Sequence, residues 1–152
     1  MKREFRRAAR LVIVDQINSV LLFQYEDGGR RWWATPGGGL EENETFEEAA
    51  AREAREELSL TDLSLTPLWS RTVDFSFNGR PVRQFEHYFL FRLQHDQRFR
   101  TSVGETHRRE KIVAIRWWSA EELKRTSEQV FPEDLHERLG ALLSAGPPAN
   151  AS

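Results

Sequence analysis

The sequence predicts an α/β (α+β) fold in which a mixed β-sheet carries helices on its faces. Short runs of branched and aromatic residues recur along the chain, which is typical of strands that pair with their neighbours. An Ala- and Glu-rich segment interrupts these runs, and two shorter helical patterns lie near the C-terminus. The chain has 152 residues, 39 % of them hydrophobic, which suits one compact domain. We expect this domain over residues 1–144, followed by a disordered tail over residues 145–152.

The first half of the chain predicts two strands followed by a long helix. The strands are expected over residues 9–15 and 19–24, and the three residues between them are typical of a hairpin turn. After a Gly-containing loop, the aromatic stretch 32–35 is ended by Pro36 and three glycines. Residues 44–58 contain no Gly, Pro or Val, so they give the strongest helix prediction in the sequence.

The second half predicts three more strands and two helices. Residues 69–77 alternate between apolar and polar residues and end at an Asn-Gly pair, which favours a tight hairpin. The return strand, residues 82–93, places its aromatic residues on one face. A last strand over residues 112–118 leads into a capping-box pattern at Ser119, and Pro132 is expected to begin the final helix.

Composition and charge exclude several classes of protein. The net charge of −2 gives no overall field toward nucleic acid or anionic lipid, so we expect neither a nucleic-acid nor a membrane partner. The absence of cysteine excludes disulfides, thiolate metal sites and a cysteine nucleophile. No apolar run approaches the roughly 20 residues that span a bilayer, and no secretory apolar segment follows the charged N-terminus. We therefore expect a cytoplasmic protein.

The long predicted helix changes from an apolar to an acidic face along its length. Glu53, Glu56 and Glu57 fall within an arc of about 100° that continues the face of Phe46 and the first alanines. Like charges at these spacings repel one another. A divalent cation such as Mg²⁺ or Mn²⁺ would relieve the repulsion, because these ions prefer oxygen ligands. The alternative is a solvated acidic face on which Arg52 pairs with its helical neighbours.

The segment from Gly38 to Leu60 resembles the Nudix box. In that pattern a glycine is followed after five residues by Glu and, after seven more, by Arg-Glu, an aliphatic residue, any residue, Glu-Glu, any residue, Gly and an aliphatic residue. The matching positions are Gly38, Glu44, Arg52, Glu53, Glu56, Glu57 and Leu60. Ala54 stands at the aliphatic position, and Ser59 replaces the glycine that would end the helix in a left-handed turn. The resemblance covers about residues 8–143.

The resemblance implies a Nudix-type α/β/α sandwich and hydrolysis of a nucleoside diphosphate linked to another group. By position, Glu53, Glu56 and Glu57 would bind Mg²⁺ or Mn²⁺, and the carbonyl oxygen of Gly38 would be a further ligand. Arg52 would orient these carboxylates. The general base would be a glutamate of the box or of a later loop, and the residues that qualify are Glu53, Glu105 and Glu110. The two that lie outside the box are equally compatible with a charged surface loop.

Other residues could contact the substrate. Glu86 lies on the strand face opposite the aromatic residues and could point into a substrate cleft. Arginines such as Arg10, Arg71 and Arg83 could fork onto phosphate, but nothing in the sequence selects among them. Asp134 follows a Phe-Pro pair that loosely resembles a base-pocket segment of MutT-like enzymes. It is equally compatible with the first turn of the final helix.

We therefore expect a Mg²⁺- or Mn²⁺-dependent pyrophosphohydrolase of a nucleoside di- or triphosphate, oxidised nucleotides of the MutT type included. One alternative is a hydrolase of nucleoside diphosphate sugars or dinucleotides, such as ADP-ribose. A further alternative is a non-catalytic nucleotide-binding Nudix module. The expected partner is a small-molecule nucleotide, and the expected oligomeric state is a monomer or a homodimer.

Overall fold

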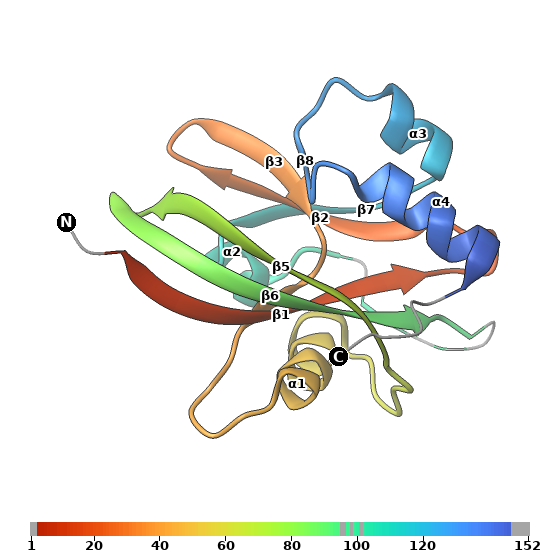
Figure 1. Ribbon diagram of the computed structural model, residues 1–152, viewed down its shortest axis with the longest axis horizontal. Coiled ribbons are helices and arrows are strands. Elements are labelled where there is room, and N and C mark those ends of the chain that lie inside the picture. Colours follow the sequence, from red (N-terminus) through yellow and green to blue (C-terminus); the bar gives the residue numbers. More distant parts are fainter. Residues whose placement is uncertain (1–2, 95–96, 98, 101, 147–152) are drawn as a thin grey trace.

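The computed structural model describes residues 3–94, 97, 99–100 and 102–146, which are built around one mixed sheet. Within these residues the sheet has eight strands in the order β5-β6-β1-β2-β3-β8, with β4 paired to β1 and β7 paired to β2 (Figure 1). The strands are β1 (Glu4–Val14), β2 (Val20–Asp27), β3 (Arg30–Ala34), β4 (Gly37–Gly39), β5 (Thr66–Phe77), β6 (Arg80–Arg92), β7 (Ile112–Trp118) and β8 (Val130–Phe131). The helices are α1 (Phe46–Leu58), α2 (Glu105–Arg109), α3 (Ala120–Arg125) and α4 (Leu135–Ala145).

Strand β1 has partners along both of its edges. On one edge it pairs in parallel with β6 from Glu4 to Val14, which explains why it begins at Glu4 and not at the predicted Ala9. On the other edge it pairs with β4 over residues 8–10 and with β2 at Val14, in the predicted hairpin. Strand β2 pairs with β7 from Val20 to Tyr25 and with β3 from Phe23 to Asp27. The two halves of the sheet therefore diverge, and the glycine turn of β4 lies where they separate.

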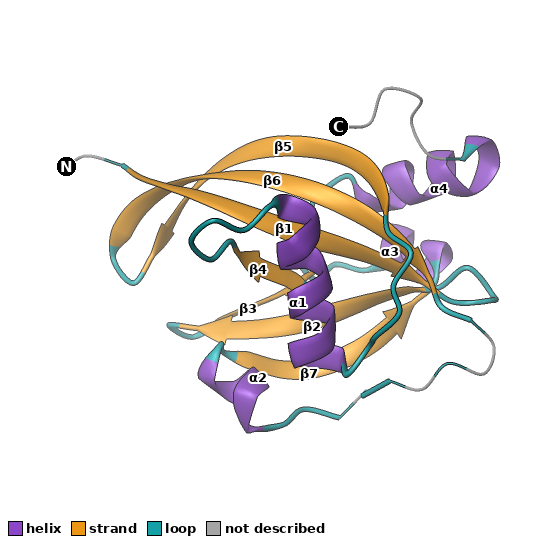
Figure 2. Cartoon of the chain, turned by 90° about the horizontal axis from the view of Figure 1, so that it is seen from below, coloured by secondary structure: helices purple, strands orange, loops and turns teal. Residues whose placement is uncertain are grey.

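Helices cover both faces of the sheet. Successive residues of β1 point to opposite faces, so Leu11 and Ile13 pack with α1 in one core, while Val12 and Val14 pack with α3 and α4 in another. Figure 2 shows α1 lying across one face, and Figure 1 shows α4 on the opposite side. The predicted sandwich with helices on both faces is confirmed. Within the described part of the chain, no helix has the length and hydropathy needed to cross a membrane.

Helix α1 begins and ends as the box predicts. Thr45 is the N-cap: its side chain accepts a hydrogen bond from the N–H of Glu48, whose carboxylate accepts one from the N–H of Thr45. Ser59 adopts the left-handed conformation, with φ of 57°, and its N–H donates to the carbonyl of Arg55 at 3.0 Å. The helix therefore ends in the turn that the box glycine would form, although Ser59 carries a Cβ.

The C-terminal part of the chain differs locally from the prediction. The final helix begins at Leu135, because Pro132 belongs to a preceding turn in which its carbonyl accepts from the N–H of Leu135 at 3.0 Å. The capping box at Ser119 forms as predicted and begins α3. Ala145 is the last residue of α4 and Gly146 is its C-cap. The remainder of the predicted disordered tail, residues 147–152, lies outside the described residues.

Candidate active site

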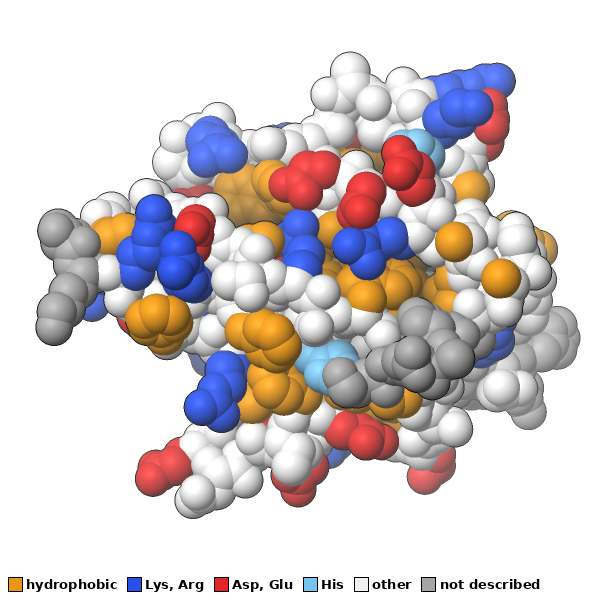
Figure 3. Space-filling view, in the orientation of Figure 1, with side chains coloured by type: hydrophobic (Ala, Val, Ile, Leu, Met, Phe, Trp, Pro, Cys, Tyr) orange, Lys and Arg blue, Asp and Glu red, His pale blue; other side chains and the backbone are white. Residues whose placement is uncertain are grey.

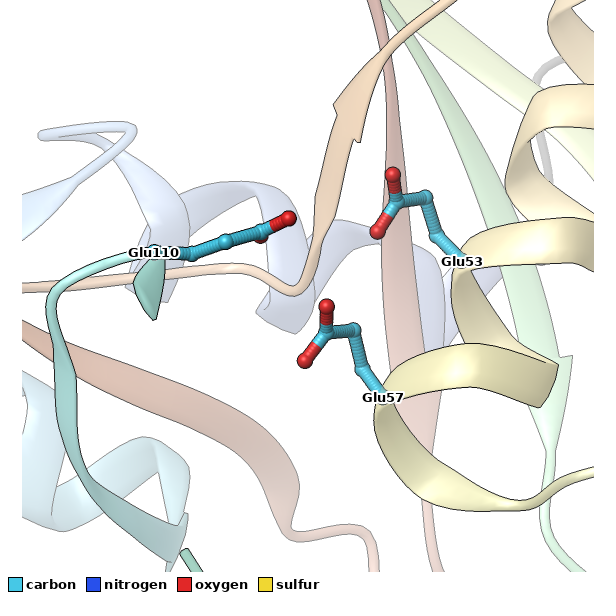
Figure 4. A group of neighbouring side chains, drawn as sticks. All are labelled: Glu53, Glu57 and Glu110. Carbon is cyan, nitrogen blue, oxygen red and sulfur yellow. The ribbon is translucent and has the colours of Figure 1, made fainter. Parts of the chain in front are cut away.

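Three carboxylates converge beside the second half of α1, and we call them the acidic cluster. Glu53 and Glu57 project from α1, and Glu110 reaches them from the segment between α2 and β7 (Figure 4). One oxygen from each side chain lies within 4.8 Å of the others. Glu53 and Glu57 are buried, whereas Glu110 is exposed. The cluster is therefore open to solvent on the Glu110 side only.

Most oxygens of the two buried carboxylates in the acidic cluster lack donors. Both oxygens of Glu57 and Oε2 of Glu53 have no hydrogen-bond partner among the described residues. Burial, followed by the negative charges of Glu110 and Glu53, raises the pKa of Glu57 to about 7. Burial and the charge of Glu110 also raise the pKa of Glu53, although Arg52 opposes the shift. The cluster is an arrangement of like charges that a cation would stabilise.

Arg52 holds the box residues in place. Its Nε and Nη2 donate to the two oxygens of Glu44 at 2.8 and 2.9 Å, and its Nη1 donates to Oε1 of Glu53 at 3.0 Å. Nη2 also donates to the carbonyl of Gly39 at 2.9 Å. The paired fork holds the pKa of Glu44 at about 2. Arg52 thus ties α1 to the glycine turn, and its role in orienting metal-binding carboxylates stays a prediction.

Gly38 allows the glycine turn to approach α1. A Cβ at this position would lie 2.5 Å from Oε1 of Glu53 and 2.9 Å from its carboxyl carbon. Any side chain at position 38 would therefore displace the Glu53 carboxylate. The position of Gly38 against the acidic cluster is consistent with its predicted role, while the carbonyl contact to a metal stays a prediction.

The short helix α2, where the sequence indicates a loop, brings Glu110 to the cluster. The N–H of Gly104 donates to Nδ1 of His107 at 2.9 Å, so the ring proton is on Nε2, which donates to the carbonyl of Glu57 at 2.6 Å. Nε2 is also 3.2 Å from Oε2 of Glu57, but its single proton points at the carbonyl, so the carboxylate gains no donor. This buried histidine fastens α2 to the last turn of α1. Glu105, by contrast, is 81 % exposed and pairs with Arg109.

Glu56 lies apart from the acidic cluster. Its side chain is 47 % exposed, and its Oε2 accepts from Nη1 of Arg52 at 3.3 Å. Among the described residues, the group whose carboxylate oxygens lie within 4.8 Å of one another is Glu53, Glu57 and Glu110, and the predicted ligand Glu56 is not part of it. The sequence offered no signal for His107, because a histidine among charged residues has no periodic pattern to identify it.

The two predicted substrate contacts lie away from the acidic cluster. Glu86 is buried on β6, where the side chains of Arg10 and Arg71 donate to its carboxylate. Asp134 stands at the start of α4 without capping it, and its carboxylate accepts from Nε of Arg138 at 2.9 Å. Both carboxylates are thus engaged by arginines.

Comparison with known proteins identifies the family. The model of the NUDIX domain matches residues 4–139. The fold is similar to that of a MutT protein from Methanosarcina mazei Go1, with a TM-score of 0.66 at 18 % identity, covering 95 % of this chain and 99 % of that one. It is also similar to an Ap4A hydrolase from C. elegans in a binary complex, with a TM-score of 0.62 at 21 % identity over 91 % and 97 % of the two chains. The NUDIX domain of Shewanella oneidensis NrtR, complexed with ADP ribose, gives a TM-score of 0.65 at 16 % identity over 95 % and 91 %.

The family model and the geometry agree with one another. The matched region contains the whole sheet, the glycine turn and the helix that carries the box residues. The acidic cluster at that helix supplies the oxygen donors that a divalent cation prefers. The chain therefore belongs to the Nudix family and is a hydrolase that acts on phosphoric anhydride bonds.

Proposed function

We propose that the chain hydrolyses the pyrophosphate linkage of a nucleoside di- or triphosphate, with Mg²⁺ or Mn²⁺ as its cofactor. One observation carries the proposal: three carboxylates converge, and three of the four oxygens of the two buried ones have no donor among the described residues. A pyrophosphate is itself an anion, so this cluster would repel the substrate unless a cation were bound.

The donors suit a hard divalent cation. Carboxylate and carbonyl oxygens are the ligands that Mg²⁺ and Mn²⁺ prefer, and the buried Glu53 and Glu57 would hold the ion, with Glu110 beside it. The carbonyl of Gly38 is proposed as a further ligand, and Glu56 as a nearby negative charge that also raises the pKa of Glu57. When bound, such an ion would neutralise the phosphates and lower the pKa of a water molecule.

Glu110 is our proposal for the general base. It is the exposed member of the acidic cluster, so its carboxylate can accept a proton from an attacking water molecule that enters from solvent. Glu53 is less suitable, because Arg52 already donates to its Oε1. Glu105 is not proposed, because its side chain points to Arg109 at the surface.

The test is a phosphate-release assay over a panel of nucleotides with Mg²⁺ or Mn²⁺. The panel compares kcat/KM for 8-oxo-dGTP, the ordinary dNTPs, nucleoside diphosphates, ADP-ribose and diadenosine polyphosphates. Turnover of a nucleoside di- or triphosphate at the highest kcat/KM supports the proposal. A preference for ADP-ribose by more than about tenfold, or 1.4 kcal/mol of transition-state binding, would replace it with the dinucleotide-type alternative.

A second experiment tests the general base and distinguishes an enzyme from a non-catalytic nucleotide-binding module. Glu110→Gln should lower kcat by roughly 100-fold, as expected for loss of general base catalysis, while Glu47→Gln on the exposed face of α1 should not change kcat. Nucleotide binding without turnover on any member of the panel would favour the non-catalytic alternative.

A further inference from the structure

Glu86 lies at the centre of a buried ionic network on the sheet face that carries α4. It is 3 % exposed, and its two oxygens accept four hydrogen bonds. Nε of Arg71 and the hydroxyl of Tyr88 donate to Oε1 at 2.8 and 2.9 Å, while Nε of Arg10 and Nε2 of Gln84 donate to Oε2 at 3.1 and 2.8 Å. These four bonds fill the acceptor sites of a carboxylate. Glu86 therefore has no acceptor left for a substrate, and it holds two guanidinium groups instead.

The two arginines keep part of their hydrogen-bonding capacity. Nη1 of Arg10 donates to the carbonyl of Thr35 at 3.3 Å, and Nη1 of Arg71 donates to Oε2 of Glu133 at 3.1 Å. In the described part of the chain, Nη2 of Arg71 has no hydrogen-bond acceptor, whereas Arg10 also interacts with the hydroxyl of Tyr25 on β2. The two side chains are 18 % and 17 % exposed, so their orientation is fixed while an edge remains accessible. The two cations share one buried anion, Glu86, and the second anion of the network, Glu133, is 68 % exposed.

One end of the network reaches toward the acidic cluster. Thr35, which accepts from Arg10, comes directly before Pro36 and the glycine turn that packs against Glu53.

The other end of the network reaches the segment before α4. Glu133, which accepts from Arg71, lies next to Asp134, and Arg138 of α4 lies over the ring of Trp69 at 4.9 Å. In Figure 3, basic and acidic side chains lie next to one another beside hydrophobic ones on this face, between β5 and α4. A surface that combines arginines with aromatic rings suits a ligand that combines phosphates with a base.

Arg83 lacks these features. It is 45 % exposed, and its Nε and Nη2 both donate to Asp74, at 2.8 and 3.1 Å. Arg83 lies three residues before Glu86 on β6. Because successive side chains of a strand point to opposite faces, Arg83 points to the face opposite Glu86. The sequence offers Arg10, Arg71 and Arg83 as possible phosphate ligands. In the structure, Glu86 accepts hydrogen bonds from the first two and not from Arg83.

We propose that Arg10 and Arg71 form a pair that binds a phosphate group of the nucleotide, with Glu86 as their positioning residue. The inference rests on the proposed function, since it assigns these side chains to the nucleotide of that reaction. A guanidinium offers phosphate a rigid fork of donors, and an orientation fixed beforehand reduces the entropy lost on binding. The scissile linkage would lie at the acidic cluster, and a further phosphate would extend along the two arginines.

The test measures anion binding without hydrolysis. Glu57→Gln serves as the parent protein in EDTA, where catalysis is disabled and one repulsive charge is removed, and calorimetry gives Kd for ADP and inorganic pyrophosphate. Arg10→Gln and Arg71→Gln should each weaken both Kd values by at least about tenfold. Arg10→Lys should recover part of the loss as a point charge, and Arg83→Gln is the matched control that should leave both values unchanged.

The outcomes separate this proposal from the proposed function. Absence of turnover by the wild type would refute the function without affecting the Kd comparison. Four results would overturn the proposed pair. In the first, the parent binds neither anion at millimolar concentrations, and in the second, the Arg10 and Arg71 variants bind as tightly as the parent. In the others, only one of these two variants loses affinity, or Arg83→Gln loses as much affinity as they do. If Arg10→Gln does not fold, Arg10→Lys and Arg71→Gln still decide.

A separate test of Glu86 is possible, because its negative charge and its positioning role predict opposite changes in Kd when it is replaced. Removal of its negative charge should by itself favour anion binding, whereas loss of its positioning role should weaken binding. We expect Glu86→Gln, in the same parent, to raise the Kd for ADP severalfold. Unchanged or tighter binding would overturn the positioning role, because a merely structural carboxylate would affect the free energy of unfolding and not this Kd.

Discussion

Glu57 and Glu86 are buried to nearly the same extent, at 1 % and 3 % exposure, but their surroundings are opposite. Four side-chain donors surround the Glu86 carboxylate, whereas the Glu57 carboxylate has no donor and faces two further carboxylates. Burial raises the pKa of both groups. The arginines beside Glu86 reverse that effect and hold its pKa at about 2, while the glutamates beside Glu57 add to it and raise its pKa to about 7.

The comparison teaches that burial alone does not identify a functional carboxylate. A buried carboxylate with all its acceptors occupied stabilises the structure around it, as Glu86 does for two arginines from different strands. A buried carboxylate without donors is stabilised only when a cation or a proton is bound. The two sites should therefore respond in opposite directions to the same substitution.

The largest expected effect is on activity at the acidic cluster. Glu57→Gln should lower kcat/KM by roughly 100-fold or more, about 2.7 kcal/mol, because the amide keeps the shape but not the charge that holds a metal. In metal-free buffer its free energy of unfolding should be unchanged or slightly higher, because a repulsive charge is gone. The measurements are steady-state kinetics and urea unfolding.

Thermal unfolding with added Mg²⁺ sharpens this first comparison. The Tm of the wild type should rise with Mg²⁺ concentration, since an ion that binds only the folded state stabilises it, and the Tm of Glu57→Gln should rise less. Wild-type activity in Glu57→Gln would show that the acidic cluster is not the metal site. Glu47→Gln, on an exposed face of the same helix, is the control.

An effect of similar size, on stability, is expected at Glu86. Glu86→Gln should lower the free energy of unfolding by about 3 kcal/mol, because it leaves Arg10 and Arg71 buried without their shared anion. Urea unfolding at neutral pH measures the change. Arg83→Gln breaks an exposed pair with Asp74 and should change stability by less than about 1 kcal/mol. A loss at Glu86 no larger than that at Arg83 would contradict the comparison.

Acid unfolding should separate Glu86 from other carboxylates. Its pKa in the folded protein, about 2, is below its ordinary value of 4.5, so its contribution to stability is complete above pH 4.5 and is lost as the pH falls toward about 2. The groups that face it, Arg10, Arg71 and Tyr88, keep their charge states over this range. The difference in unfolding free energy between wild type and Glu86→Gln should therefore shrink across this window. A constant difference would mean that the carboxylate charge is not what stabilises the site.

The sequence could predict two of the three members of the acidic cluster, because a helix has a period. The spacing of Glu53 and Glu57 places both on one face of α1, and the structure confirms it. The sequence predicted Glu56 as the third carboxylate of the metal site, and it named Glu105 and Glu110, besides Glu53, only as candidates for the general base. A segment without a period does not define side-chain directions, and here the hydrogen bonds of His107 decide which glutamate meets α1.

Strand alternation predicted the face of Glu86 but not its partners. The side chain lies opposite the aromatic residues, as expected, yet it contacts Arg10 of β1 and Arg71 of β5. Those contacts depend on the parallel register of β1 with β6 and the antiparallel register of β5 with β6. No local sequence pattern sets the parallel register of β1 with β6. The sequence therefore could not show whether Glu86 lies in a substrate cleft or in a buried ionic network.

The smallest expected effect lies at the end of α1, where neither carboxylate environment is involved. Ser59 holds a left-handed conformation that disfavours a Cβ by roughly 1–2 kcal/mol, while glycine loses roughly 0.5–1 kcal/mol more in backbone entropy on folding. Ser59→Gly should therefore raise the free energy of unfolding by about 0.5 kcal/mol, measured by urea unfolding. Because Glu57 stays in the same helical turn, kcat/KM and the Mg²⁺-dependent rise in Tm should match the wild type. A change in either would show that the helix end, and not only the unpartnered carboxylates, sets the properties of the acidic cluster.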